Sequence, residues 1–404
     1  MSIVIDYPED MIKGTFKIKI KHDVFNWLIG DSGWTSKEIA DRLGYPEREI
    51  SRWGIEGKDI EIPINKVEIL AESIKRPIAS FFLLHPPHGI SRPKDFRKLP
   101  RERAEPYSKE THLAMRKARR LQKISADLMG ALGYQTKANV NKYEITTNNS
   151  EKTAKDERLR SGITARDQLH WENESKALSN WKKWIESKNI LVFQIKMPMK
   201  DARGFSFSDV EPYIIVLNKS DSVNGRIFSL FHEYAHILLG ETVICNIESD
   251  SSHDIGIRRI EKWCNYFAGA FLLPEDRISG DPEINELLKH GKTTECIRKL
   301  SKSYKISEYG VLVRLRNLDY IGDLEYEIEK VRILKEIDEN LKKKQERERE
   351  RELRIPLEIK CQSEKGNRLI SLVFEGSDKG IISESDVLDY LDIKDKNFER
   401  MHES

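Results

Sequence analysis

The chain has 404 residues, of which 38% are hydrophobic and 34% are charged, and its net charge of +2 favours no particular class of partner. This length favours roughly two or three domains, and no stretch approaches the about 18 apolar residues of a membrane span. The start, MSIVIDYPED, lacks the layout of a secretory signal, and the four scattered cysteines form no CxxC pair, so a protein of the reducing cytoplasm is expected.

Residues 1–84 form the first predicted domain, in which residues 22–84 are a compact set of short helices that ends in the apolar run IASFFLL. Within it, WTSKEIADRLGYPEREISRWGIEG (34–57) has the pattern of a helix, a tight turn and a helix. Thr35 and Glu38 have the spacing of a capping box, which begins a helix. Gly44 stands where the turn needs a residue without a side chain.

This pattern resembles the helix-turn-helix domain of the Xre/Cro type, whose second helix enters the major groove of DNA. The groove-facing positions would be Arg48, Ser51 and Arg52, together with Glu47 and Glu49. The two glutamates depart from the usual set because both oppose the phosphate field, although glutamate can accept a hydrogen bond from cytosine N4. The resemblance implies double-stranded DNA as a partner. Docking onto another helix-turn-helix protein is the alternative.

A Pro-rich linker is predicted over residues 85–107, and a mainly helical stretch follows to about residue 190. Two strand-like runs come next, ILVFQIKM (190–197) and PYIIVLN (212–218).

The run FSLFHEYAHILLG (228–240) places two histidines and a glutamate in an apolar helix. His232 and His236 are four residues apart, so their imidazoles project from one helix face, where they can bind one zinc ion. Glu233 lies beside the first ligand and can act as general base toward a metal-bound water. A chance HExxH is the alternative, but the apolar flanks bury this helix, and an unligated set of three polar groups there is costly.

A catalytic zinc ion needs a third protein ligand and one open position. Glu261 stands at the start of a second apolar helix, IEKWCNYFAGAFLLP (260–274), and is the best candidate. An ordinary carboxylate at a helix N-terminus is the alternative interpretation. Asn265, one turn further on the same face, can hydrogen-bond a ligand. His253, in the polar loop ESDSSHD, is a weaker candidate ligand.

The run GFSFSDVEPYIIVLNKSDSVNGRIFSLFHEYAHILLG, followed by IEKWCNYFAGAFLLP, resembles the ImmA/IrrE family of zinc peptidases. The family shows a GFS-type strand entry, an apolar strand ending in Asn, an Arg before the HExxH helix and a later E-x-x-A-N-x-F-A segment. Cys264 stands where the family usually has Ala. The resemblance implies His232, His236 and Glu261 as ligands of one Zn²⁺ ion, with Mn²⁺ and Fe²⁺ as alternative ions, and Glu233 as general base.

Beyond the motif, residues 323–354 form a charge-dense helix that we interpret as a solvated spacer rather than a long coiled coil. The predicted fold class is α+β and mainly helical: a helix-turn-helix domain, a zincin-like metallopeptidase domain and a small C-terminal α+β unit. The domain boundaries are 108–322 for the peptidase, with its catalytic core at 190–275, then 323–355 for the spacer and 356–404 for the C-terminal unit.

The expected function is regulated cleavage of a repressor or antitoxin by a zinc metallo-endopeptidase, as in a stress response or a toxin–antitoxin system. The segment YIIVLN would bind the substrate backbone as an edge strand, unless it is an inner core strand. The alternative function is a DNA-binding transcription regulator or an antitoxin-like protein, with a structural or sensory zinc site. The presence of Glu233 argues against that alternative, because a structural site has no use for this carboxylate.

Overall fold

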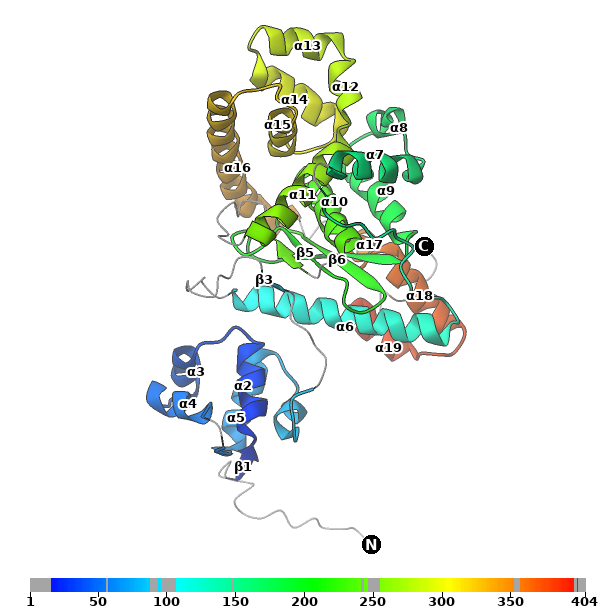
Figure 1. The fold of residues 1–404 in the computed structure, drawn as a ribbon. Helices are drawn as coiled ribbons and strands as arrows, with labels where there is room; N and C mark the ends of the chain where they lie inside the picture. The colour runs from blue at the N-terminus through cyan, green and yellow to red at the C-terminus, as the bar shows by residue number, and fades with distance from the viewer. Residues whose placement is uncertain are drawn as a thin grey trace. The chain divides into compact units, whose positions relative to one another are not determined.

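The computed structural model describes residues 16–55, 57–87, 94–95, 107–146, 149–240, 243–245, 255–351, 357–395 and 398. The chain divides into two compact units. Unit 1 comprises Met1–Arg92 and Glu105–Arg116, and unit 2 comprises Pro93–Ala104 and Lys117–Ser404. Helices predominate and small sheets accompany them, so the predicted class, α+β and mainly helical, is confirmed (Figure 1). The finer division into five segments stays a prediction.

Unit 1 contains short helices and one small sheet that the sequence did not predict. Strands β1 and β2 pair antiparallel, with Ile18 opposite Ile62 and Ile20 opposite Ile60. All four isoleucines are buried and join the core of the unit. The elements are β1 (Lys17–Ile20), α2 (His22–Gly30), α3 (Ser36–Leu43), α4 (Glu47–Trp53), β2 (Ile60–Pro63), α5 (Ile64–Ile74) and the 3-10 helix η1 (Ile78–Phe82).

Helices α3 and α4 and the turn between them agree with the predicted pattern. Thr35 Oγ1 accepts from the Glu38 N–H at 3.2 Å, and the Thr35 N–H donates to Glu38 Oε2 at 2.9 Å, which completes the capping box. Gly44 ends α3 with φ +74°, a left-handed conformation that favours glycine. Arg48, Ser51 and Arg52 are all exposed on α4. Their contact with DNA stays a prediction.

Unit 2 holds the remaining elements, and the boundary between the units falls within α6 (Lys109–Ala131). No helix among the described residues has both the length and the apolar composition that a membrane crossing requires. The other elements are β3 (Lys94–Asp95), α7 (Asn149–Ser161), α8 (Ala165–His170), α9 (Glu174–Glu186), β4 (Ile190–Ile195), β5 (Gly204–Phe207), β6 (Tyr213–Asn218), α10 (Val223–Leu239), β7 (Val243–Cys245), α11 (Ile255–Leu272), α12 (Glu275–Ser279), α13 (Pro282–Lys289), α14 (Thr293–Tyr304), α15 (Glu308–Asn317), α16 (Asp323–Arg351), α17 (Leu357–Lys365), α18 (Asn367–Asp378) and α19 (Glu384–Leu391).

The sheet of unit 2 has the strand order β3-β7-β5-β6-β4. Strand β6 pairs with β4 in parallel and with β5 antiparallel, so both of its edges are hydrogen-bonded. The interpretation of YIIVLN as an edge strand is therefore wrong. Five of its six residues are fully buried, as expected for a strand that is covered on both faces.

Helices α9, α10 and α11 form the core beside this sheet. Helix α10 lies against β5 and β6 and packs along α11 (Figure 1). Aromatic rings from all three helices meet there, among them Trp181, Phe231 and Phe271. Phe231 and Phe271 stack with ring centroids 4.2 Å apart, and Trp181 meets Phe231 edge-on at 5.0 Å. These contacts fix α10 and α11 against each other, because aromatic pairs bury large areas in defined geometries.

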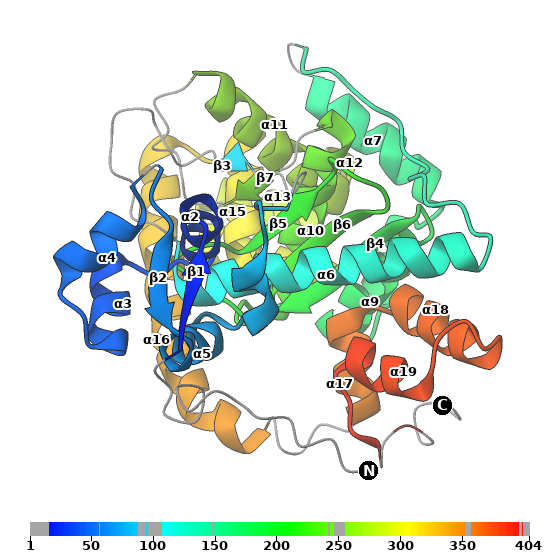
Figure 2. The same ribbon diagram turned by 90° about the horizontal axis from the view of Figure 1, so that it is seen from below.

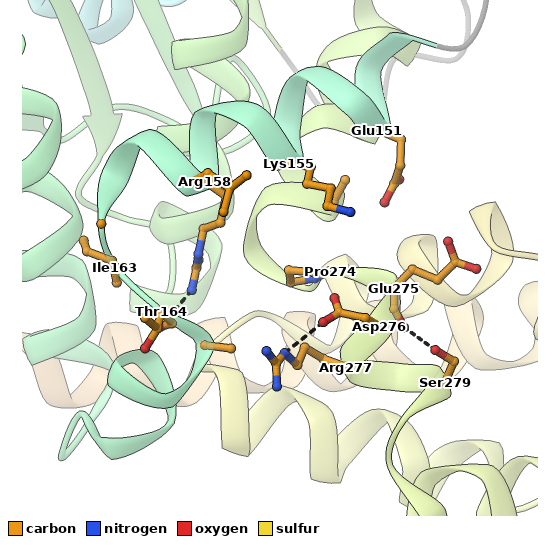
Figure 3. A pocket seen from close by; sticks show the side chains of 14 residues that line it. Glu151, Lys155, Arg158, Ile163, Thr164, Pro274, Glu275, Asp276, Arg277 and Ser279 are labelled. Atoms are coloured by element: carbon orange, nitrogen blue, oxygen red, sulfur yellow. Dashed lines mark hydrogen bonds and ion pairs between the residues drawn. The ribbon is translucent and has the colours of Figure 1, made fainter.

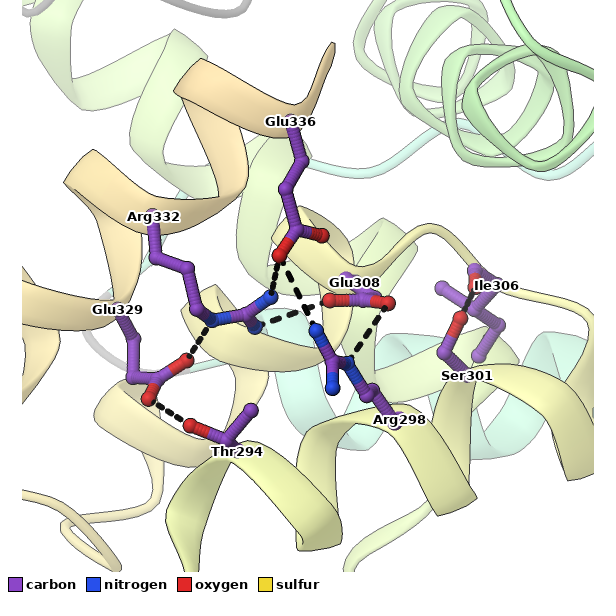
Figure 4. Close-up of polar contacts among 8 residues, drawn as sticks. All are labelled: Thr294, Arg298, Ser301, Ile306, Glu308, Glu329, Arg332 and Glu336. Carbon is purple, nitrogen blue, oxygen red and sulfur yellow. Dashed lines mark hydrogen bonds and ion pairs between the residues drawn. The ribbon is translucent and has the colours of Figure 1, made fainter. Parts of the chain in front are cut away.

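The charged helix α16 is not a solvated spacer over its first turns, which corrects the prediction. Ile333 is buried against α15, and Arg332 forms ion pairs with Glu308 of α15 and with Glu329 and Glu336 of α16 (Figure 4). Arg298 of α14 reaches the same Glu336 at 3.1 Å. The packing of α16 on α15 was not predicted from the sequence, because the buried face of α16 holds isolated apolar residues among paired charges.

The C-terminal stretch 357–395 forms the three helices α17, α18 and α19 and contains no strand, so the strand expected in this unit is not found. In α18, Leu369, Leu372 and Val373 are buried and lie three or four residues apart, which is a helical rather than a strand period. The three helices lie together near β4, against which α17 packs (Figures 1 and 2).

Two buried ionisable residues of α9, Lys182 and Glu186, interact with the C-terminal helices. Lys182 Nζ donates to Ser363 O in α17 at 2.9 Å. Burial raises the pKa of Glu186 to about 7, although Lys182 and the N–H groups of Asn367 and Val192 favour its charged form. Gly366, with φ +76°, lies close to the backbone of β4, because a Cβ at this position would be 2.9 Å from Val192 O. The outer edge of β4, the last strand in the order, is thus covered at Val192.

Candidate metal centre

Helix α10 carries the HExxH residues into the interior of unit 2. Ser222 caps its N-terminus by accepting from the Gly225 N–H at 3.0 Å, and Gly240 ends it with φ +76°. The helix is buried along most of its length because its residues are mostly apolar. His232 and His236 are fully buried, and they present their Nε2 atoms to each other at 3.1 Å.

Helix α11 brings Glu261 to the same point. Its Oε2 lies 3.3 Å from His232 Nε2, and its Oε1 lies 3.3 Å from His236 Nε2. In a tetrahedral site with metal–ligand bonds of about 2.0–2.1 Å, neighbouring donors are about 3.3–3.4 Å apart. In the part of the chain that the structure describes, this is the one group of three His, Cys, Asp or Glu side chains whose ligand atoms lie within 4.8 Å of one another. The donor set and its spacing therefore fit one metal ion.

The electrostatics of the three side chains are those of a cation site. Burial acts to lower the pKa of His232, but hydrogen bonding and charge from Glu261, and the charge of Glu233, raise it above its ordinary value. Burial acts to raise the pKa of Glu261, and the two histidines outweigh it, so that pKa lies far below its ordinary range. The carboxylate is held in its charged form, which is the form that binds a metal.

Strand β5 positions Glu233, the proposed general base. Ser206 Oγ donates to Glu233 Oε2 at 2.9 Å, and both side chains are buried. Gly204, two residues earlier on the same strand face, leaves room for Glu233: a Cβ there would lie 3.4 Å from Glu233 Oε1 and 3.0 Å from Val216 O. Neither role was predicted from the sequence, although both residues belong to the GFS-type strand entry.

Asn265 lies near His232, and its role in supporting this ligand stays a prediction. It is one of the groups that raise the pKa of His232. Its Oδ1 and His232 Nδ1 are buried, and neither has a hydrogen-bond partner among the described residues. His253, the weaker candidate ligand, lies outside the described residues.

Another buried carboxylate, Glu157 of α7, was also not predicted from the sequence. It accepts from Tyr234 Oη at 2.7 Å and from Tyr143 Oη at 3.0 Å, and Arg160 Nη1 donates to it at 2.9 Å. Tyr234 follows Glu233 directly on α10, so Glu157 fixes the rotation of the helix that carries the metal ligands. The burial of Glu157 could not be predicted from the sequence, because α7 has a polar composition with no clear apolar face.

Comparison with protein families identifies the segment that contains this site. Residues 185–316 match the M78 peptidase family model, described as the IrrE N-terminal-like domain. Over these residues the chain is similar to that family. Searches of curated proteins and of solved structures found no match to the chain.

The matched segment includes α10, α11 and the sheet strands β4 to β7, and therefore all four residues of the candidate centre. The match supports a metallopeptidase type of function in general. It ends before α16 and does not reach unit 1, so the assignment of unit 1 to the Xre/Cro type stays a prediction.

Proposed function

We propose that this protein is a zinc-dependent endopeptidase that cleaves a regulatory protein, such as a repressor or an antitoxin. One observation carries the proposal: His232, His236 and Glu261 meet at metal-ligand spacing, next to a buried glutamate on the same helix. A purely structural zinc site uses four protein ligands. The described residues offer three, which leaves the open position that catalysis needs.

The chemistry follows from the residues in place. A zinc ion, when bound, polarises a carbonyl and lowers the pKa of water to about 7. His232, His236 and Glu261 would hold the ion. Glu233 would take the proton of the attacking water on its carboxylate and pass it to the leaving amine, because it lies next to the first ligand. Ser206 holds that carboxylate in one orientation by donating to Oε2.

The regulatory substrate is proposed from the organisation of the chain. Unit 1 is separate from the peptidase unit and exposes Arg48, Ser51 and Arg52 on a short helix that follows a tight turn. A unit of this kind would bring the peptidase to a protein that sits on DNA, which raises the effective concentration of substrate without new catalytic contacts. Cleavage inside the cytoplasm would then be selective rather than digestive.

The test compares three purified proteins: wild type, Glu233→Gln and Glu261→Ala. Bound zinc is measured by mass spectrometry, and each protein is incubated with the regulatory proteins encoded beside it. We expect one zinc ion in wild type and Glu233→Gln and much less in Glu261→Ala, with cleavage by wild type alone. Glu172→Gln is the matched control, because this glutamate is exposed in the same unit and lies in no site.

Two results would contradict the proposal. Wild type without bound metal would remove the ion on which the reaction depends. Cleavage by Glu233→Gln at the wild-type rate would show that this carboxylate is not the general base. If Glu233→Gln still represses a promoter as wild type does, the alternative is favoured, a DNA-binding regulator with a structural or sensory metal site.

A further inference from the structure

A cavity of about 590 Å³ lies between α7, the turn into α8, and α12, in unit 2 (Figure 3). Its volume is within the range of small-molecule sites. Part of its wall is apolar, and part carries charged side chains from α7 and α12. The apolar part is formed by Leu159, Ile163, Ala165, Ala270 and Pro274.

Arg158 is a buried charged residue of this wall, with only 8% of its surface exposed. Its guanidinium donates to three neutral oxygens: Gln168 Oε1 at 2.8 Å, and Thr164 O and Phe271 O at 3.2 Å each. These acceptors orient the group but carry no full negative charge. Among the described residues, no carboxylate forms an ion pair with Arg158. A buried cation without a counter-ion is costly unless something else supplies the charge.

A second guanidinium faces the same part of the cavity. Arg277 extends from α12 toward Arg158 from the opposite wall (Figure 3). Burial lowers the pKa of Arg158 to about 10, and the charge of Arg277 acts in the same direction, whereas Tyr304 and Asp167 act to raise this pKa. Asp276 Oδ2 lies 3.3 Å from Arg277 Nε, but both side chains are exposed, so this ion pair is weak, and it leaves Arg158 without a carboxylate. Glu151 is bound by Arg314 through two hydrogen bonds of 2.6 Å, and Glu275 points away from Arg158.

We propose that this cavity binds a small organic anion, a carboxylate or phosphate joined to an apolar group, with its charged end between Arg158 and Arg277. The guanidinium geometry suits both anions, because each can accept two parallel hydrogen bonds from an arginine. The apolar wall then covers the rest of the ligand. This site is separate from the metal centre and does not depend on the proposed reaction.

The test measures the thermal unfolding of the full-length protein with two matched pairs of probes: hexanoate against hexanamide, and hexyl phosphate against hexanol. We expect one anion or both to raise the melting temperature by about 2–4 °C at ten times its Kd, and the neutral partners not to do so. The hexanoate and hexyl phosphate arms separate a carboxylate ligand from a phosphate ligand.

Variants locate the binding. Arg158→Gln should weaken it at least tenfold, but this variant loses three buried hydrogen bonds and can fail to fold. Arg277→Gln changes an exposed side chain and should weaken binding about threefold to tenfold. Arg166→Gln, an exposed arginine of α8 outside the cavity, should leave it unchanged. The proposal is overturned if neither anion stabilises the protein more than its neutral partner, or if Arg277→Gln leaves the anion's Kd unchanged.

Discussion

At the scale of single residues, the candidate centre depends on β5 as much as on the helix with the motif. Gly204 and Ser206 lie two residues apart and so belong to the same face of that strand, beside Glu233. The glycine gives the carboxylate space, and the serine gives it a hydrogen bond. Substitution of Gly204 should therefore change the stability of the fold, and substitution of Ser206 should change the turnover.

Ser206→Ala should retain the metal ion and lower kcat by about tenfold to a hundredfold, because a hydrogen bond to a charged group contributes about 1.5–3 kcal/mol. Ser206→Thr keeps the hydroxyl and should recover part of that loss. Turnover and bound metal are measured on the same preparations. Loss of metal in Ser206→Ala, or an unchanged kcat, would show that the hydroxyl does not act through Glu233.

Gly204→Ala should lower the free energy of unfolding by about 1–3 kcal/mol, because the new methyl group meets a strand carbonyl that cannot move away. Gly130→Ala is the matched control. Gly130 lies in α6 with nothing within 4 Å of its Cβ position, and this change should stabilise the helix by about 0.5–1 kcal/mol. Urea unfolding of the two variants checks the opposite signs.

At the scale of elements, α7 is fixed to α10 through the Glu157 carboxylate. Burial acts to raise the pKa of Glu157, but Tyr234, Lys188, Tyr143 and Asn141 favour the charged form more strongly, so its pKa lies below the ordinary value. A carboxyl with a lowered pKa stabilises the fold above its unfolded-state pKa, and this contribution is lost as the pH falls.

Glu157→Gln should therefore cost about 1–3 kcal/mol at pH 7, and the difference from wild type should shrink as the pH falls from about 5 to 3. Unfolding by urea at several pH values measures this difference. Glu172→Gln, which changes an exposed glutamate, should show no such dependence. A difference that grows toward low pH would mean that Glu157 is protonated in the folded protein at neutral pH.

Much of this element-scale arrangement could be predicted from local pattern. The spacing of His232 and His236 predicts that they share a helix face, and the spacing of Thr35 and Glu38 predicts the start of a helix. Strand order could not be predicted, because the apolar content of β6 is the same for an inner and an edge strand. Ser206 and Glu157 reach α10 only through tertiary packing, from positions 27 and 77 residues distant in sequence.

At the scale of the whole molecule, the C-terminal helices close the sheet of unit 2 at β4. A chain that ends at residue 351 should lose this cover and aggregate, because it exposes the edge of an apolar strand and the buried pair Lys182 and Glu186. A chain that ends at residue 395 keeps α17, α18 and α19 and should stay monodisperse. Size-exclusion chromatography with light scattering compares the two. Equal behaviour of both chains would mean that β4 needs no cover.

The same cover has a consequence for synthesis on the ribosome. Strand β4 ends at Ile195, whereas α17 begins at Leu357, so the ribosome must add more than 150 residues between them. At about 5–20 residues per second, this takes roughly 10–30 s. During that time the nascent chain carries an uncovered apolar strand edge, which is the kind of surface that chaperones bind. Synthesis of α17, α18 and α19 thus ends the period in which this strand edge is uncovered.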